Sequence, residues 1–130
     1  MLKQKKTIFA LSSSQSKSAI ALIRISGGLA YRCVEKISLN MPKKPNVTAF
    51  NTLVDPEGGI IDQTLTTFFK GPKSFTGEDM VEISTHGSPA VIKKIYKIFL
   101  KESLNIASPG EFTRRAFENN KLNLTQVEAI

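Results

Sequence analysis

The 130-residue sequence predicts an α+β domain with a mixed, mostly antiparallel β-sheet and flanking helices. Three observations predict this class. Strand-like and helical segments are interspersed along the chain, two of the strand-like segments flank a strong hairpin turn (DPEGG, residues 55–59), and there is no internal repeat. Hydrophobic residues make up 41% and charged residues 22% of the chain, which fits one globular domain and excludes wholesale disorder.

The first two strands are expected near the amino terminus. Residues 7–11 (TIFAL) are typical of a short strand, and residues 12–18 (SSSQSKS) of a polar loop. Residues 19–25 (AIALIRI) form a nearly continuous apolar run, as in a strand covered on both faces. Arg24 interrupts that run. An arginine there either pairs with an acid or holds an anion at the exposed end of the strand.

A helix and a hairpin follow. Residues 29–37 have apolar side chains at i, i+4 and i+8, one of which is Cys33, so we expect a helix with Cys33 buried as a small hydrophobe. Because Cys33 is the only cysteine, no internal disulfide can form, which favours a reducing, cytoplasmic location. Residues 47–54 and 60–69 are the two strands of the hairpin.

Residues 80–86 (MVEISTH) show the most regular alternation in the chain. A strand has a side-chain period of two, so its β-branched face suits a core, and its other face carries Met80, Glu82, Ser84 and His86. A carboxylate is costly to bury unpaired, so Glu82 needs solvent, a cation or the N–H groups of a ligand. A half-exposed strand with a wet face is the simpler alternative. We assign His86 no role beyond lining a pocket.

The last third of the chain predicts two more helices around a short strand. Residues 89–102 have an apolar stripe and an outer face of lysines, and residues 104–107 are a further strand. The sequence SPGE, from Ser108, has the spacing of a capping box and predicts a short helix through residue 118, with Phe112 and Phe117 as candidates for burial.

The final residues have the pattern of a domain boundary. Residues 121–124 are expected to be a linker, and the TQVE sequence from Thr125 has the spacing of a capping box that opens another helix. We therefore expect a domain at residues 1–120, and in residues 121–130 a linker and the start of a second, helical domain that continues in a longer protein.

The chain is basic, with 18 Lys and Arg against 11 Asp and Glu and a net charge of +7, which favours anionic partners. The basic residues are scattered, so a lysine-rich solubility surface explains the charge equally well.

No apolar run approaches the roughly 20 residues of a membrane helix, and we expect no membrane partner. One histidine and one cysteine on different elements do not form a metal site, and no catalytic residue is assigned.

Four segments together carry a family resemblance: TIFALSS, AIALIRISG, FTGEDMVEISTHG and SPGEFTRRAFENNKLNLTQVEAI. In this order they closely resemble the amino-terminal domain of the tRNA-modification GTPases of the MnmE (TrmE) family, over essentially the whole chain. Two loops depart from the family pattern. The early loop lacks the usual Pro, Gly and Arg, and Ser88 stands where a second glycine is common.

The resemblance implies a fold similar to the folate-binding domain of the glycine-cleavage aminomethyltransferases, and a homodimer formed through this domain. It implies a bound 5-formyltetrahydrofolate or 5,10-methylenetetrahydrofolate near the dimer interface. A full-length relative adds a GTP-hydrolysing domain that uses Mg and K. With the FAD-dependent MnmG (GidA), it modifies carbon five of the wobble uridine of tRNA to give carboxymethylaminomethyl-uridine. This chain has no GxxxxGK[ST] loop, so by itself it is not expected to hydrolyse GTP or to be catalytic.

The family's folate contacts fall on Arg24, Glu82 and Lys121 by motif. The resemblance implies that Glu82 accepts two N–H groups of the pterin as a bidentate pair and that Arg24 or Lys121 neutralises the glutamate tail. Other readings remain open for these residues, since Arg24 and Glu82 can pair with each other and Lys121 can be a solvated linker residue. An alternative function is a basic module that binds RNA or a protein and uses no small ligand.

Overall fold

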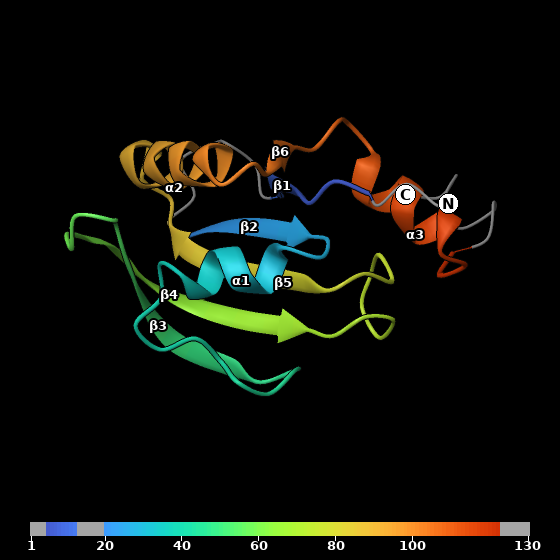
Figure 1. Cartoon of the computed structure of the whole chain (residues 1–130), viewed down its shortest axis with the longest axis horizontal. Coiled ribbons are helices and arrows are strands. Elements are labelled where there is room, and N and C mark those ends of the chain that lie inside the picture. The colour runs from blue at the N-terminus through green and yellow to red at the C-terminus, as the bar shows by residue number, and fades with distance from the viewer. Residues whose placement is uncertain (1–4, 13–19, 123–130) are drawn as a thin grey trace.

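A computed structural model of the chain describes residues 5–12 and 20–122 (Figure 1). The strands are β1 Ile8–Leu11, β2 Ile20–Ser26, β3 Thr48–Val54, β4 Ile60–Phe69, β5 Met80–His86 and β6 Asn105–Ile106. The helices are α1 Ala30–Glu35, α2 Pro89–Lys101 and α3 Glu111–Glu118.

The described strands form one sheet in the order β3-β4-β5-β2-β1-β6. Four of the pairings are antiparallel, and β6 runs parallel to β1. The expected α+β class with a mixed, mostly antiparallel sheet is therefore confirmed. The sheet brings β2 and β5 side by side although more than 50 residues separate them in the sequence, which no local pattern specifies.

One face of the sheet packs against α1 and α2 and forms the core. Val81 and Ile83 of β5 are fully buried there, as the alternation predicted, and so are Ile23 and Ile25 of β2. The expectation that β2 is covered on both faces is wrong, because α1 and α2 cover only one face of the sheet and Ile20 on the other face is 62% exposed. Phe9 meets Phe99 of α2 edge to face at 5.3 Å. Cys33 is buried in the same cluster, as expected. Because alternate residues of a strand point to opposite faces, this packing directs Arg24 and Glu82 to the other face.

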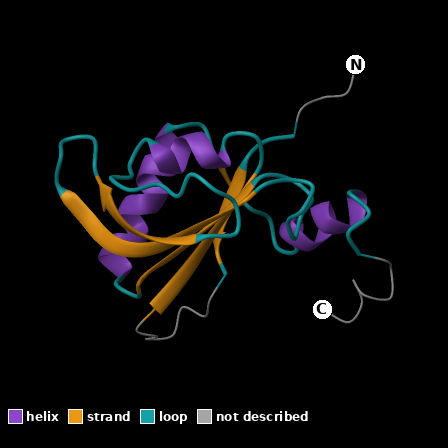
Figure 2. Ribbon diagram, turned by 90° about the horizontal axis from the view of Figure 1, so that it is seen from below, coloured by secondary structure: helices purple, strands orange, loops and turns teal. Residues whose placement is uncertain are grey.

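The third helix occupies a different place. Figures 1 and 2 show α3 beyond one end of the sheet, apart from α1 and α2. At this end Ser26 and Met80 are buried, although they belong to the outer face of their strands. The expectation of a wet face throughout residues 80–86 is thus wrong at Met80, because neighbouring segments cover that end of the strand.

Two further expectations are corrected at α3. Phe117 is 42% exposed, so it is not part of the core, whereas Ala116 is fully buried. The helix begins at Glu111 after Gly110, so Ser108 is not its N-cap. Half of the expected capping box remains, because Glu111 Oε1 accepts a hydrogen bond from the Ser108 N–H at 2.8 Å. The expected loop beyond Ser12 and the helix expected from residue 125 lie outside the described residues.

Candidate functional site

The outer face of the sheet carries the polar residues that the sequence singled out. The strand register places Arg24 of β2 opposite Glu82 of β5, and Glu82 opposite Thr67 of β4. Residues that face each other on neighbouring strands project to the same side of a sheet. The three side chains therefore form a polar row across a face that α1 and α2 leave uncovered.

Arg24 and Glu82 form an ion pair. The Arg24 Nε–H donates to Glu82 Oε2 at 2.7 Å, and the two side chains are 33% and 26% exposed. An ion pair with this much contact with water contributes about 1 kcal/mol or less to stability. Each charge of the pair compensates the other. A ligand with N–H donors can take the place of Arg24 on Glu82 at a small cost in free energy.

A pocket of about 450 Å³ opens beside this pair. It is lined by side chains or backbone from β2, from the loop before β5 and from the start of α3: Arg24, Phe75, Gly110, Glu111, Phe112 and Thr113. The centroid of the Phe75 ring lies 5.8 Å from the Arg24 guanidinium carbon, a cation–π distance. The pocket thus combines a cation with aromatic surface, which suits a planar ligand that carries negative charge.

The loop at residues 70–79, which supplies Phe75, is held at several points. Asp79 Oδ1 accepts from the Gly71 N–H at 2.9 Å, and the Thr76 hydroxyl hydrogen-bonds the buried Ser26 hydroxyl at 2.7 Å. Gly77 adopts φ +83°, and a Cβ there would lie 2.8 Å from the Asn119 side chain. These contacts hold the loop, and with it Phe75, beside Arg24.

A charge network attaches α3 to the rest of the domain. Arg115 is 5% exposed, and its guanidinium donates to Glu78 at 3.0 Å and to Glu111 at 3.1 Å. Burial alone would raise the pKa of Glu111, but the Ser108 N–H and the charges of Arg115 and Arg114 outweigh it and lower that pKa. The network therefore fixes the helix that forms one wall of the 450 Å³ pocket.

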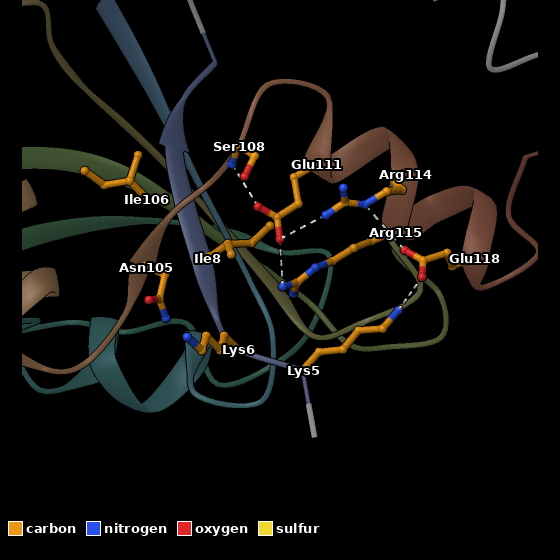
Figure 3. A pocket seen from close by; sticks show the side chains of 10 residues that line it. All are labelled: Lys5, Lys6, Ile8, Asn105, Ile106, Ser108, Glu111, Arg114, Arg115 and Glu118. Carbon is orange, nitrogen blue, oxygen red and sulfur yellow. Dashed lines mark hydrogen bonds and ion pairs between the residues drawn. The ribbon is translucent and has the colours of Figure 1, made fainter. Parts of the chain in front are cut away.

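A second pocket, of about 440 Å³, lies where residues 5–8 meet β6 and α3 (Figure 3). Its charged side chains largely pair with one another: Lys5 with Glu118 at 3.6 Å, Arg114 with Glu118 at 3.8 Å, and Arg115 with Glu111. The four cations outnumber the two carboxylates here, but no aromatic side chain lines this pocket, so it is a weaker candidate for a planar anionic ligand than the pocket beside Arg24.

Lys121 lies apart from Arg24 and Glu82. Its ammonium donates to the Pro72 carbonyl at 3.0 Å, and the residue is exposed. Of the three candidate residues only Arg24 lines the 450 Å³ pocket. Glu82 is next to that lining through its ion pair with Arg24, and Lys121 contacts the loop that carries Phe75. The structure thus brings two of the three candidate residues together and places the third in contact with the neighbouring loop at Pro72.

The remaining candidate groups lie elsewhere. His86 is at the far end of β5, where its Nδ1 is 2.7 Å from Asp62 Oδ1, and it is not among the lining residues of the pocket. Burial and nearby Glu102 raise the pKa of the Cys33 thiol, which keeps it protonated.

No metal-binding group of three or more His, Cys, Asp or Glu occurs among residues 5–12 and 20–122. No helix in these ranges is long and apolar enough to cross a membrane.

Sequence reasoning missed Phe75 and Arg115. Phe75 lies in a stretch of Gly, Ser and Thr with no periodicity, and its proximity to Arg24 arises only when the loop folds back over β2. Arg115 lies in a short polar helix, where an arginine is ordinarily solvated. The capping-box pattern around Glu111 was the only local sign that this helix is anchored.

Comparison with known proteins gives concordant matches. Residues 7–121 match the family model described as "GTP-binding protein TrmE N-terminus". The chain is similar to the tRNA modification GTPase MnmE of Dinoroseobacter shibae (45% identity over 125 residues), of Thermotoga maritima (42% over 124) and of Ehrlichia chaffeensis (47% over 128). Each match covers 95% of this chain but only 28–29% of the relative, so the chain spans less than a third of the length of these proteins.

Proposed function

Because the chain belongs to the family of TrmE amino termini, we propose that it is the tetrahydrofolate-binding and dimerisation domain of a GTPase that modifies tRNA. The ligand is 5-formyltetrahydrofolate or 5,10-methylenetetrahydrofolate. The domain comprises residues 1–120, and residues 121–130 lead into a helical domain of the longer protein.

The observation that carries the folate proposal is the Arg24–Glu82 pair beside a pocket walled by Phe75. A pterin ring has an amino group and a ring N–H side by side, and a carboxylate accepts both as a bidentate pair. The strand holds the Glu82 carboxylate in a fixed position from which it can accept both N–H groups. Its present partner, Arg24, is partly exposed, so a ligand can displace it. When the pterin replaces the Arg24 Nε–H, the guanidinium becomes available to an anionic group of the same ligand.

Phe75 and Lys121 have supporting roles in this proposal. The Phe75 ring supplies a flat apolar surface to the ligand next to the Arg24 charge. Lys121 contacts the loop at Pro72, so it neutralises a carboxylate of the glutamate tail that extends from the pocket along this loop. A lysine acts there as a mobile point charge, which suits a flexible tail better than a rigid ring.

The dimer proposal has support on the same face of the sheet. Phe50 of β3 and Leu65 of β4 are opposite each other in the register and are 60% and 50% exposed, and Ile20 of β2 is 62% exposed. Apolar side chains gathered on an uncovered sheet face mark a protein interface more often than scattered ones do. A dimer that buries this face brings the pocket close to the interface.

The longer protein hydrolyses GTP with Mg and K in a domain outside this chain, and acts with the FAD-dependent MnmG (GidA) on tRNA in the cytoplasm. The relatives' name, tRNA modification GTPase, supports this assignment. The domain's part in it is to supply a bound one-carbon unit, while its own residues bind and orient the folate. The chain alone has no phosphate-binding glycine loop and hydrolyses no GTP.

Calorimetric titration of the chain with 5-formyltetrahydrofolate tests the folate proposal. We expect saturable binding of one ligand per chain. The fragment p-aminobenzoyl-glutamate, which lacks the pterin, is the matched control and should bind much more weakly. Equal binding of the fragment would assign the recognition to the tail, and no binding of either compound would overturn the proposal.

A further inference from the structure

The outer face of α2 carries a row of three lysines, Lys93, Lys97 and Lys101, at i, i+4 and i+8. All three are exposed, and within residues 5–12 and 20–122 none of them has an ion-pair partner. The opposite side of the helix is fixed, because Ile95 and Phe99 are fully buried against the sheet. The helix therefore cannot rotate to turn these charges inward.

The acids nearest to this row are largely engaged with other cations. Asp55, in the turn between β3 and β4, binds Lys94 at 2.9 Å, and Glu102 binds Lys36 at 3.0 Å. The contact with Asp55 satisfies Lys94 locally, and this hydrogen bond raises the pKa of the lysine. Of the neighbouring acids only Glu57 remains without a cation partner in the described residues. The three lysines of the row thus outnumber the one neighbouring acid without a cation partner, Glu57, and leave a net positive charge on this face of α2.

The distance between successive lysines of the row is similar to the distance between the charges of a polyanion. With a rise of 1.5 Å per residue, lysines four residues apart lie about 6 Å apart along the helix axis, which is close to the separation of successive phosphates in an RNA strand. Lysine is a compact point charge that suits phosphate oxygens. The exposed face of α2 carries no aromatic side chain for stacking on bases, so contacts there would be to the backbone.

We propose that the row Lys93, Lys97 and Lys101 on α2 binds the phosphate backbone of RNA. An acidic protein is a poorer fit, because protein interfaces need a buried apolar or aromatic anchor and Leu100 is the only large apolar side chain that is well exposed on this helix. The row itself is defined by the geometry of α2. The choice of RNA as the polyanion rests on the proposed function in tRNA modification.

This surface is separate from the proposed folate site. The buried side of α2 packs on Phe9 and the core face of the sheet, whereas Arg24 and Glu82 lie on the opposite face. RNA and folate therefore bind to different faces of the domain. RNA binding and folate binding can each be measured when the other is absent, so a failure of the RNA proposal can be told apart from a failure of the folate proposal.

Fluorescence anisotropy with a labelled RNA stem-loop tests the proposal. The variant is the triple Lys93→Gln, Lys97→Gln, Lys101→Gln. The matched control is Lys43→Gln, Lys44→Gln, Lys73→Gln, which removes the same charge from exposed loop lysines. At about 50 mM salt we expect the α2 variant to bind at least about tenfold more weakly than the parent and the control to stay within about threefold. The magnitude of the negative slope of log K for RNA binding against log salt concentration should decrease by about 2 in the α2 variant only.

Replacing the same three lysines with arginine should keep the binding, and circular dichroism shows whether each variant is folded. Equal weakening in the α2 variant and the control would assign the binding to net charge and overturn the proposal. Absence of RNA binding by the parent would overturn it as well. Binding of the parent to vesicles with anionic lipid or to an acidic peptide, but not to RNA, would assign the row to that partner instead.

Discussion

Replacing Glu82 with glutamine separates a ligand role from a structural one. The change keeps the size and shape of the side chain but turns one acceptor oxygen into a donor. In the parent, Glu82 Oε2 accepts from the Arg24 Nε–H at 2.7 Å. An amide oxygen can still accept that hydrogen bond, so the variant loses the charge and retains the packing.

The effect of Glu82→Gln on stability should be small. The ion pair is 26–33% exposed, and an ion pair in such contact with water contributes about 1 kcal/mol or less. For a domain of this size that corresponds to a fall of at most about 5 °C in the melting temperature.

The effect of Glu82→Gln on folate binding should be large. The amide donor would face a donor of the pterin, and one charge-assisted hydrogen bond would be lost. We expect a cost of about 2–4 kcal/mol, or roughly 30- to 1,000-fold in the Kd for 5-formyltetrahydrofolate. Calorimetry on parent and variant measures the ratio directly, and thermal melting measures the stability of each.

Glu35→Gln is the matched control, because it removes an exposed carboxylate from α1 and should leave both quantities unchanged. Parent-like folate binding by Glu82→Gln would show that the pterin is held elsewhere. Unfolding of the variant would show instead that Glu82 is chiefly the structural partner of Arg24.

Four further predictions follow from the same structure. Lys121→Ala should weaken folate binding by about 1 kcal/mol, or roughly fivefold, because its contact is solvated; a calorimetric loss as large as that of Glu82→Gln would refute this ranking. Arg115→Met should lower the free energy of unfolding by about 2–4 kcal/mol in urea titrations, since it leaves the carboxylates of Glu78 and Glu111 without their buried cation; a stability within 1 kcal/mol of the parent would contradict it. The pKa of Glu111 is lowered in the folded state, so its contribution to stability is present above its unfolded pKa and is lost as the pH falls through the folded value. The melting temperature of the parent should therefore fall more steeply below about pH 5 than that of Glu111→Gln; parallel curves would exclude this role. Leu65→Asp should convert a dimer to a monomer in light scattering, because it places a charge on the exposed apolar part of the sheet; an unchanged dimer mass would locate the interface elsewhere.

Local patterns in the sequence were sufficient for most of the elements. Periods of two and 3.6 residues placed the strands and helices within a few residues of the observed bounds, because each period records which side chains face the core. They also placed Ile83 in the core and Cys33 on the inner face of its helix. The errors at Met80 and Phe117 arose where a side chain is covered or exposed by an element distant in sequence.

The sequence alone thus determined the α+β class and the family, and the resemblance to that family named Arg24, Glu82 and Lys121 as candidate residues. The tertiary structure decided which of these residues contact each other. The register of β2 against β5 sets Arg24 opposite Glu82 across more than 50 residues of chain, and the folding of the 70–79 loop places Phe75 beside Arg24. The physical reason is that periodicity reports only the face on which a side chain lies. Which strand lies beside it, and which loop covers it, depends on non-local packing that minimises exposed apolar surface over the whole chain.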